Sequence, residues 1–317
     1  MADALVSPPV AAVAGVAAAS LLVVATRKVA KSKRTDIIPL MGVMGAFVFA
    51  AQMINFSIPG TGSSGHIIGG VLLAAFLGPW AAYLTLCSVL IVQCLVFADG
   101  GLMALGCNMI NMAAMSTLIG WPLIYKPLVK YPASTARIML ASVLACVVSL
   151  EAGALLVSAE TVASGITALP LGKFLMFMLP IHLAIGICEG VATGLVVAFV
   201  QRYNAPLLTG PAVAGEHKAS PARRKRLLWG FGIAALILAV AFTWIASANP
   251  DGLEWSIEKV AGVAELAPAS TPATAFMPDY ESHFAGIVGG VLVMITLWAV
   301  TTVMFRRRRL HATSHVE

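Results

Sequence analysis

The sequence predicts an all-α, polytopic membrane protein, with a body of seven helices and two further transmembrane helices after it. Of its 317 residues, 59% are apolar and only 11% are charged, whereas a soluble domain carries about 25% charged residues. The apolar residues also form blocks that approach the roughly 20 residues needed for a helix to cross a bilayer. Short alternating segments, which are typical of a membrane β-barrel, are absent from the sequence.

Nine apolar blocks predict the membrane helices and divide the chain into two parts. Only Gly78-Pro79-Trp80 separates the short third block from the fourth, which predicts a tight hairpin whose first helix starts below the surface, after an inward loop at 60–65. A polar stretch with several Pro and Gly residues at 206–226 predicts a cytoplasmic linker between a membrane body at 1–205 and an appendage at 227–317. The blocks are residues 9–26, 37–56, 66–79, 81–98, 102–125, 136–158, 172–200, 227–246 and 284–305.

The basic residues predict the orientation in the membrane. Eighteen of the twenty Lys and Arg residues follow the first, fifth, seventh or ninth block, so with nine helices they all lie on one side. Basic loops face the cytoplasm, which predicts an N-terminus outside and a C-terminus in the cytoplasm. This distribution explains the net charge of +6 without nucleic acid. The charge distribution therefore predicts contact with membrane lipid and none with nucleic acid.

The loop between the last two blocks is acidic, unlike the basic loops on the other side. Residues 247–283 hold six acidic side chains against Lys259 alone, and the end of the loop is rich in Pro, Ala, Ser and Thr. Such a composition predicts an outer loop with little core of its own. An acidic outer surface attracts cations, although a merely solvated loop explains the same composition.

His66 is the first candidate for a binding residue. It lies in a glycine-rich stretch at 60–70, at the predicted outer start of the third helix. Glycine lets the backbone approach a small object closely, and a neutral imidazole binds transition metals. One His cannot hold a metal well, so the other donors must come from elsewhere, and the N-terminus lies on the same predicted side. An interfacial His without a ligand is the alternative.

Polar residues within apolar blocks form a second set of candidates, because they are costly in a membrane. Asn108 and Asn111 are three residues apart and share a helix face, where they either brace a loop or hydrogen-bond to other helices. His182 and Glu189 also share a face and either begin a proton or ion path or pair structurally. The full set is Asn55, Gln93, Asn108, Asn111, Glu151, His182 and Glu189.

Several sequence motifs are specific enough to identify a resemblance. They are the start Met1-Ala2-Asp3-Ala4-Leu5, then Ser64-Gly65-His66-Ile67-Ile68-Gly69-Gly70, Leu77-Gly78-Pro79-Trp80-Ala81-Ala82, Gln93-Cys94-Leu95-Val96-Phe97-Ala98-Asp99-Gly100-Gly101 and Ala104-Leu105-Gly106-Cys107-Asn108-Met109-Ile110-Asn111-Met112. Over residues 1–205 the chain resembles the substrate-binding (S) component of cobalt/nickel energy-coupling factor transporters, the CbiM/NikM family. Residues 227–305 resemble its small companion subunit, and Pro250-Asp251-Gly252-Leu253-Glu254 matches the PDGLE signature.

The resemblance implies a function and a site. A divalent Ni²⁺ or Co²⁺ ion is the transported substrate, and a transmembrane coupling (T) subunit and ATPase subunits are the partners, in the inner (plasma) membrane of a prokaryote. The terminal amine, the next backbone nitrogen and a second-position His bind the metal together with a loop His, which corresponds to His66. By this resemblance, the backbone nitrogens of Met1 and Ala2 are expected to be metal donors in this chain. Asp99, Gln93, Asn108 and Asn111 are expected to support the site.

The chain departs from the family at its start, where Met1-Ala2 lacks a second-position His. In one interpretation the true start lies just upstream, as Met-His before Met1. In the other the chain starts as written, and only His66 and Asp3 remain as candidate side-chain ligands. The motifs do not distinguish nickel from cobalt.

The sequence lacks the Walker A, H-E-x-x-H and G-x-S-x-G motifs, so the chain is not expected to be an enzyme. The main alternative function is a cation permease or channel that is not coupled to ATP, with a path that begins at His182 and Glu189. A structural membrane scaffold is a third class, which tight metal binding would exclude.

Overall fold

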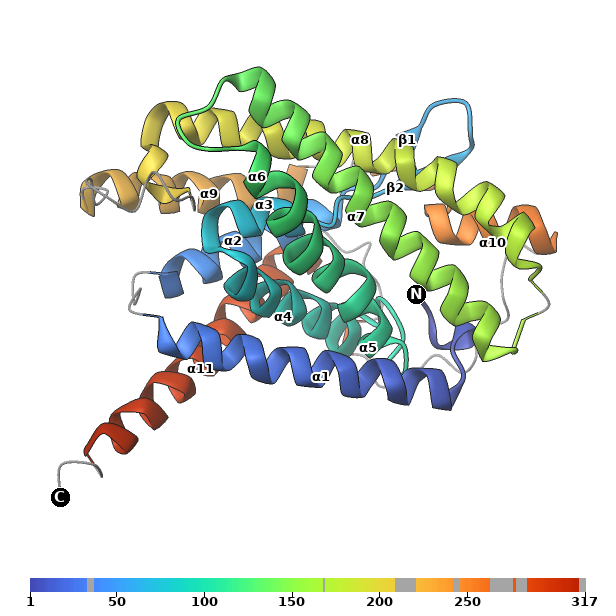
Figure 1. Cartoon of the computed structure of the whole chain (residues 1–317), viewed down its shortest axis with the longest axis horizontal. Helices are drawn as coiled ribbons and strands as arrows, with labels where there is room; N and C mark the ends of the chain where they lie inside the picture. Colours follow the sequence, from blue (N-terminus) through green and yellow to red (C-terminus); the bar gives the residue numbers. More distant parts are fainter. Residues whose placement is uncertain are drawn as a thin grey trace.

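The computed structural model describes residues 1–32, 37–167, 169–208, 221–241, 246–262, 276–277 and 284–313. These residues form a bundle of helices with one small hairpin, and the all-α, polytopic prediction is confirmed (Figure 1). The long helices are α1 (Pro8–Lys31), α2 (Ile37–Gln52), α4 (Pro79–Phe97), α7 (Thr135–Ser164), α8 (Leu171–Asn204), α9 (Pro221–Ala241) and α11 (Ala285–Thr313). The shorter elements are η1 (Asp3–Leu5), β1 (Phe56–Ile58), β2 (Ser63–Gly65), α3 (Gly70–Leu77), α5 (Leu105–Asn108), η2 (Met109–Tyr125), α6 (Lys126–Leu128), η3 (Ala205–Leu207) and α10 (Gly252–Ala261).

The nine predicted blocks overlap helices of the structure, but several of their bounds differ. By length and composition, α1, α4, α7, α8 and α11 could each cross a membrane, and α2 is a shorter apolar helix of 16 residues. The fifth block is a continuous helix in which the π-helical η2 follows α5 and leads into α6. The third block becomes helical only at Gly70, because β2 and the segment after it run inside the protein, and Ser63 and Ser64 are fully buried.

The two ends of the bundle carry different segments. Figure 1 shows the N-terminus, the β1–β2 hairpin, α10 and the start of α8 at one end. The end of α1, the start of α2, α6 and the end of α8 lie at the opposite end. The segments that contain Arg27, Lys126 and Arg202 therefore lie toward the end opposite the N-terminus.

The acidic segment at 246–262 is more ordered than its composition predicted. It contains α10, which starts with a capping box, because Asp251 accepts backbone hydrogen bonds and the Glu254 side chain accepts one from the Asp251 N–H. Ile257 is buried in a cluster that also contains Leu5 and Phe174. The expectation of little core was wrong for this segment, because α10 packs against α8. Residues 263–275 and 278–283 of the acidic loop lie outside the described part.

The helix of the eighth predicted block starts earlier than predicted. Helix α9 begins at Pro221 instead of residue 227, so the end of the predicted linker is helical. Most of the linker, at 209–220, lies outside the described residues. On α11, Gly289 lies directly against the Phe49 ring of α2, and Gly286 faces Ala239 of α9. These close contacts pack α11 against both α2 and α9.

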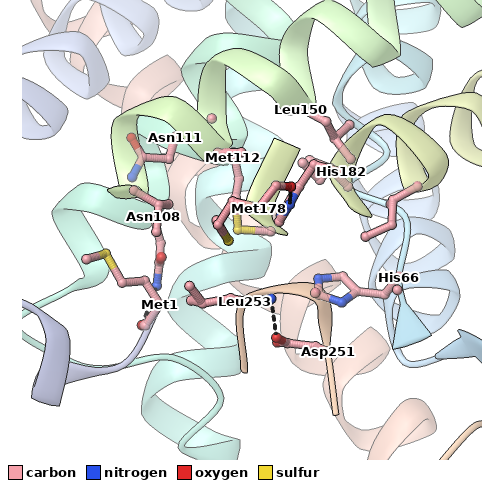
Figure 2. A pocket seen from close by; sticks show the side chains of 17 residues that line it. Met1, His66, Asn108, Asn111, Met112, Leu150, Met178, His182, Asp251 and Leu253 are labelled. Atoms are coloured by element: carbon pink, nitrogen blue, oxygen red, sulfur yellow. Dashed lines mark hydrogen bonds between the residues drawn. The ribbon is translucent and has the colours of Figure 1, made fainter. Parts of the chain in front are cut away.

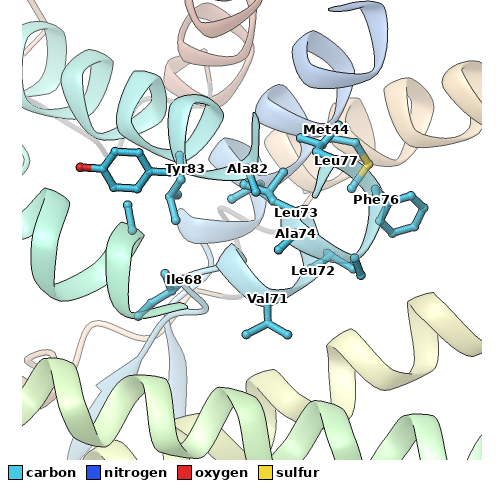
Figure 3. Close-up of a cluster of buried hydrophobic side chains, with 14 of the residues drawn as sticks. Met44, Ile68, Val71, Leu72, Leu73, Ala74, Phe76, Leu77, Ala82 and Tyr83 are labelled. Atoms are coloured by element: carbon cyan, nitrogen blue, oxygen red, sulfur yellow. The ribbon is translucent and has the colours of Figure 1, made fainter. Parts of the chain in front are cut away.

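The main core surrounds α3, in which all eight residues are buried (Figure 3). The helix packs between α2, α4 and η2. Its Phe76 ring is fully buried and lies edge-on to Phe231 of α9, with 5.4 Å between the ring centroids. The short helix is therefore a rigid base directly after the loop that carries His66.

We expect Phe76→Ala to lower the free energy of unfolding by about 3–5 kcal/mol, because it leaves a cavity among packed side chains. The measurement is thermal unfolding of the purified full-length protein in detergent. Leu195→Ala is the matched control, because Leu195 is 57% exposed on the outside of α8. Equal effects of the two substitutions would contradict the central position of α3.

Candidate metal centre

His66 is held at the end of a short hairpin. Strands β1 and β2 pair antiparallel, with Phe56 opposite Gly65 and Ile58 opposite Ser63. The connecting turn places Gly60 and Gly62 at φ values of 78° and 76°, which a side chain would strain. His66 follows β2 directly, so the hairpin determines where the imidazole lies in the body.

The imidazole lines a cavity of about 110 Å³. Figure 2 shows His66 and His182 on one side of this cavity, Met1 and Asn108 on the other, and Asp251 and Leu253 across its remaining face. These residues come from the N-terminus, the loop before α3, the α5–η2 helix, α8 and the start of α10. The lining residues are Met1, Gly65, His66, Ile68, Asn108, Asn111, Met112, Leu150, Gly153, Ala154, Val157, Met178, His182, Ile185, Asp251, Gly252 and Leu253.

Met1 and Asp3, both candidates from the sequence, bind the N-terminus to the body. The Met1 carbonyl accepts hydrogen bonds from the Gly101 N–H at 3.1 Å and from Asn108 Nδ2 at 3.2 Å. The two Asp3 carboxylate oxygens accept from the Leu102 and Ala104 N–H groups at 3.1 and 3.0 Å. Asp3 does not line the cavity, so its carboxylate anchors the N-terminus at the 102–104 turn.

The other predicted supporting residues have different positions. Asn111 lines the cavity, and its Nδ2 donates to Glu160 Oε2 at 2.6 Å. Gln93 is buried and contacts the His66 loop indirectly, through Gln52. Asp99 is exposed and does not line the cavity.

His182 and Glu189, predicted to share a face of one helix, have separate contacts. The Nδ1 atom of His182 lies 2.7 Å from the Met178 carbonyl oxygen, and the ring lines the cavity. If Nδ1 carries the proton for this bond, the lone pair lies on Nε2. The Glu189 carboxylate does not line the cavity and instead accepts hydrogen bonds from Ile68 and Gly69, just after His66.

The start of α10 closes the cavity, which the sequence analysis did not predict. The Ser64 N–H donates to the Pro250 carbonyl oxygen at 2.8 Å, and Ser64 Oγ donates to the Asn249 carbonyl oxygen at 2.8 Å. Ser64 and Asp251 form a parallel bridge, so this segment extends the hairpin beside His66. The indole N–H of Trp255 donates to the Thr61 carbonyl oxygen at 3.0 Å.

Two acidic residues of this segment interact with each other. Repulsion by Asp251, and then burial, raise the pKa of the Glu254 carboxyl above its usual range. Glu254 is therefore more easily protonated in the folded protein than in the unfolded chain, and this contribution to stability is present at low pH and is lost as the pH rises through the raised pKa. The start of α10 thus holds two carboxylates that repel each other, and Asp251 is the one that lines the cavity.

Two of these polar groups, Asp251 and Glu160, were not predicted from the sequence. Asp251 was expected only in the acidic loop and the PDGLE signature, and its position at the cavity depends on pairing with Ser64, 187 residues earlier. Glu160 lies beyond the predicted end of the sixth block, whereas α7 continues to Ser164. Glu160 continues a helical face of that block, and this pattern in the sequence could have identified it.

Side chains alone do not form a complete metal site in the described part of the chain. No group of three or more His, Cys, Asp or Glu residues in that part is arranged to hold a metal ion. His66 would therefore need donors of another kind, and the N-terminus is the candidate source, because Met1 lines the same cavity, although Ala2 does not. Nitrogen donors of this kind suit late first-row divalent metals.

Known proteins share both parts of this architecture. Residues 1–207 match the family CbiM, described as the cobalt uptake substrate-specific transmembrane region, and residues 225–306 match the PDGLE domain. The fused nickel transport protein NikMN of Rhodobacter capsulatus is 32% identical over 314 residues, which cover 94% of this chain and 85% of that protein. The cobalt transport protein CbiM of Geobacter sulfurreducens is 28% identical over 259 residues, covering 78% of this chain and 70% of that protein.

A crystal structure of a truncated transition metal transporter aligns with a TM-score of 0.56 at 33% identity and covers 64% of this chain and 98% of that one. All three relatives are named as transport proteins, which agrees with the expectation that the chain is not an enzyme. The matched regions are those that the sequence motifs indicated. The chain therefore belongs to the CbiM family of cobalt uptake substrate-specific transmembrane proteins and carries a PDGLE domain on the same polypeptide.

Proposed function

We propose that this protein is the membrane subunit that captures Ni²⁺ or Co²⁺ for uptake into the cell. One observation carries the proposal: Met1 and His66, which are far apart in the sequence, line one cavity closed by the start of α10. The relatives named for nickel and cobalt transport support the same class of substrate. The metal is the transported substrate.

The proposed ligands are the His66 imidazole and the nitrogens of the N-terminal residues Met1 and Ala2. Asn108 supports the site by binding the Met1 carbonyl, and Gln93 supports it through Gln52. Asn111 supports the far wall through Glu160. A set of nitrogen donors favours Ni²⁺ and Co²⁺ over Mg²⁺ and Ca²⁺, which prefer oxygen.

The proposed orientation has the N-terminus and α10 outside a prokaryotic inner membrane and the C-terminus in the cytoplasm. The end of α1, helix α6 and the end of α8, which contain Arg27, Lys126 and Arg202, lie toward the end opposite the N-terminus, and this supports it. The cavity then lies on the outer side of the protein, where the metal is available, with the start of α10 over it. The matches to 1–207 and 225–306 support the proposed division into a metal-binding domain at 1–205, a linker at 206–226 and a PDGLE-type domain at 227–317.

Uptake is proposed to be driven by ATP through separate coupling and ATPase subunits. We therefore expect cells that produce this protein with those subunits to accumulate radioactive Ni²⁺ or Co²⁺ several-fold faster than cells that produce it alone. An ATPase subunit with an inactivated Walker A lysine is the matched control, because assembly is retained while hydrolysis is lost.

The alternative is a permease that does not depend on ATP. It requires His182 and Glu189 to open onto a common path, and the engagement of the Glu189 carboxylate by two backbone N–H groups argues against such a path. Uptake that stays undiminished with the inactivated ATPase would favour the permease and overturn ATP coupling.

A further inference from the structure

Glu189 is a carboxylate buried in the body, with only 1% of its surface exposed. Its Oε2 atom accepts a hydrogen bond from the Ile68 N–H at 2.8 Å, and Oε1 accepts one from the Gly69 N–H at 2.9 Å. Both carboxylate oxygens on α8 are thus used to hold the backbone shortly after His66.

The same backbone is held from the opposite side. Gln52 Nε2, at the end of α2, donates to the Ile68 carbonyl oxygen at 2.8 Å. Gln93 Nε2 on α4 donates to Gln52 Oε1, also at 2.8 Å, so the Gln52 amide has a fixed orientation. Both the N–H and the carbonyl of Ile68 are therefore bonded to buried side chains from different helices.

The local backbone explains why a carboxylate is needed here. Gly69 has a φ of 77° and is the N-cap of α3, so the chain turns sharply between the His66 loop and the helix. A Cβ atom at Gly69 would lie 2.7 Å from Val48 Cγ1, which leaves the turn no room to move. N–H groups at the start of a helix lack internal partners, and the helix dipole favours a negative charge there.

We propose that Glu189, assisted by Gln52, is the positioning residue of the metal site. Its carboxylate fixes the Ile68–Gly69 backbone, and this backbone fixes the direction in which the His66 imidazole enters the cavity. Glu189 itself lies outside the cavity lining and does not ligate the metal. The inference rests on the proposed function, because the group that it positions is the proposed His66 ligand.

The test is Glu189→Gln in the full-length purified protein. Gln has nearly the same shape but only one acceptor oxygen, so its NH₂ group opposes one of the two backbone N–H groups. Groups that orient a metal-binding His typically contribute about 10–100-fold to metal affinity. We expect the Kd for Ni²⁺, measured by calorimetric titration, to rise at least about 10-fold, with a shift in the visible absorption band of bound Ni²⁺.

Glu151→Gln is the matched control, because Glu151 is a partly buried carboxyl on α7 that does not line the cavity. It is expected to leave the Kd and the absorption band unchanged. Gln52→Met tests the other side of the Ile68 backbone and is expected to shift the same band. If Glu189→Gln does not fold, Glu189→Asp, which keeps the charge on a shorter side chain, takes its place and is expected to shift the band as well.

Three results would count against the inference. A wild-type Kd and absorption band in folded Glu189→Gln would overturn it, as would a lower Tm of that variant with unchanged metal binding. An unchanged band in Gln52→Met would overturn the assistance by Gln52. Failure of the wild-type protein to bind Ni²⁺ or Co²⁺ would instead overturn the proposed function, and the inference with it.

Discussion

Replacing His66 with Ala is expected to lower the affinity of the purified protein for Ni²⁺ or Co²⁺ by more than about 100-fold, beyond the usual effect of changing a group that only orients a ligand. His66 is the imidazole that the hairpin delivers to the cavity. The described residues offer no group of three or more acidic, His or Cys side chains that could replace it. Removing this donor leaves the N-terminal nitrogens without their partner across the cavity.

The measurement is calorimetric titration of the protein in detergent, followed by uptake assays in cells. His311→Ala is the control, because it removes an imidazole from the chain at the far end of α11. If His66→Ala bound metal with the affinity of the wild-type protein, the cavity would not be the metal site.

Gly101→Ala is expected to weaken metal binding by about 100-fold while His66 remains in place, because the N-terminal donors are displaced. A Cβ atom at Gly101 would overlap the Asp3 carboxylate and the Asp3 backbone nitrogen. The Gly101 N–H also donates to the Met1 carbonyl, so the added methyl group separates two segments that are in direct contact. The N-terminus should therefore leave its place beside the cavity.

The same titration measures this effect, and circular dichroism establishes that the helices are retained. Gly172→Ala is the matched control, because a Cβ atom there would meet no heavy atom within 4 Å. Wild-type affinity in Gly101→Ala would show that the N-terminus contributes no ligand. Together with His66→Ala, the substitution separates the two proposed sources of nitrogen.

The membrane helices were predictable because the bilayer imposes a length and an apolar composition that can be seen in a linear sequence. His66 was predictable as well, since a single His among glycines stands out between apolar blocks. The bonds of Glu189 to the Ile68 and Gly69 N–H groups were not, because no periodicity indicates which backbone group a buried side chain will meet. The order in α10 was missed because composition reports average solvation, whereas Ile257 is buried only through contact with a distant cluster.

The pairing of Ser64 with the Pro250–Asp251 backbone has a consequence for stoichiometry. Since both segments belong to one polypeptide, each cavity has its own closing segment. The pairing of the two segments is a unimolecular event. The effective concentration of the segment is then set by the length of chain between them and is independent of how much protein the cell makes. Even a weak pairing can therefore keep the cavity covered for most of the time and still release quickly.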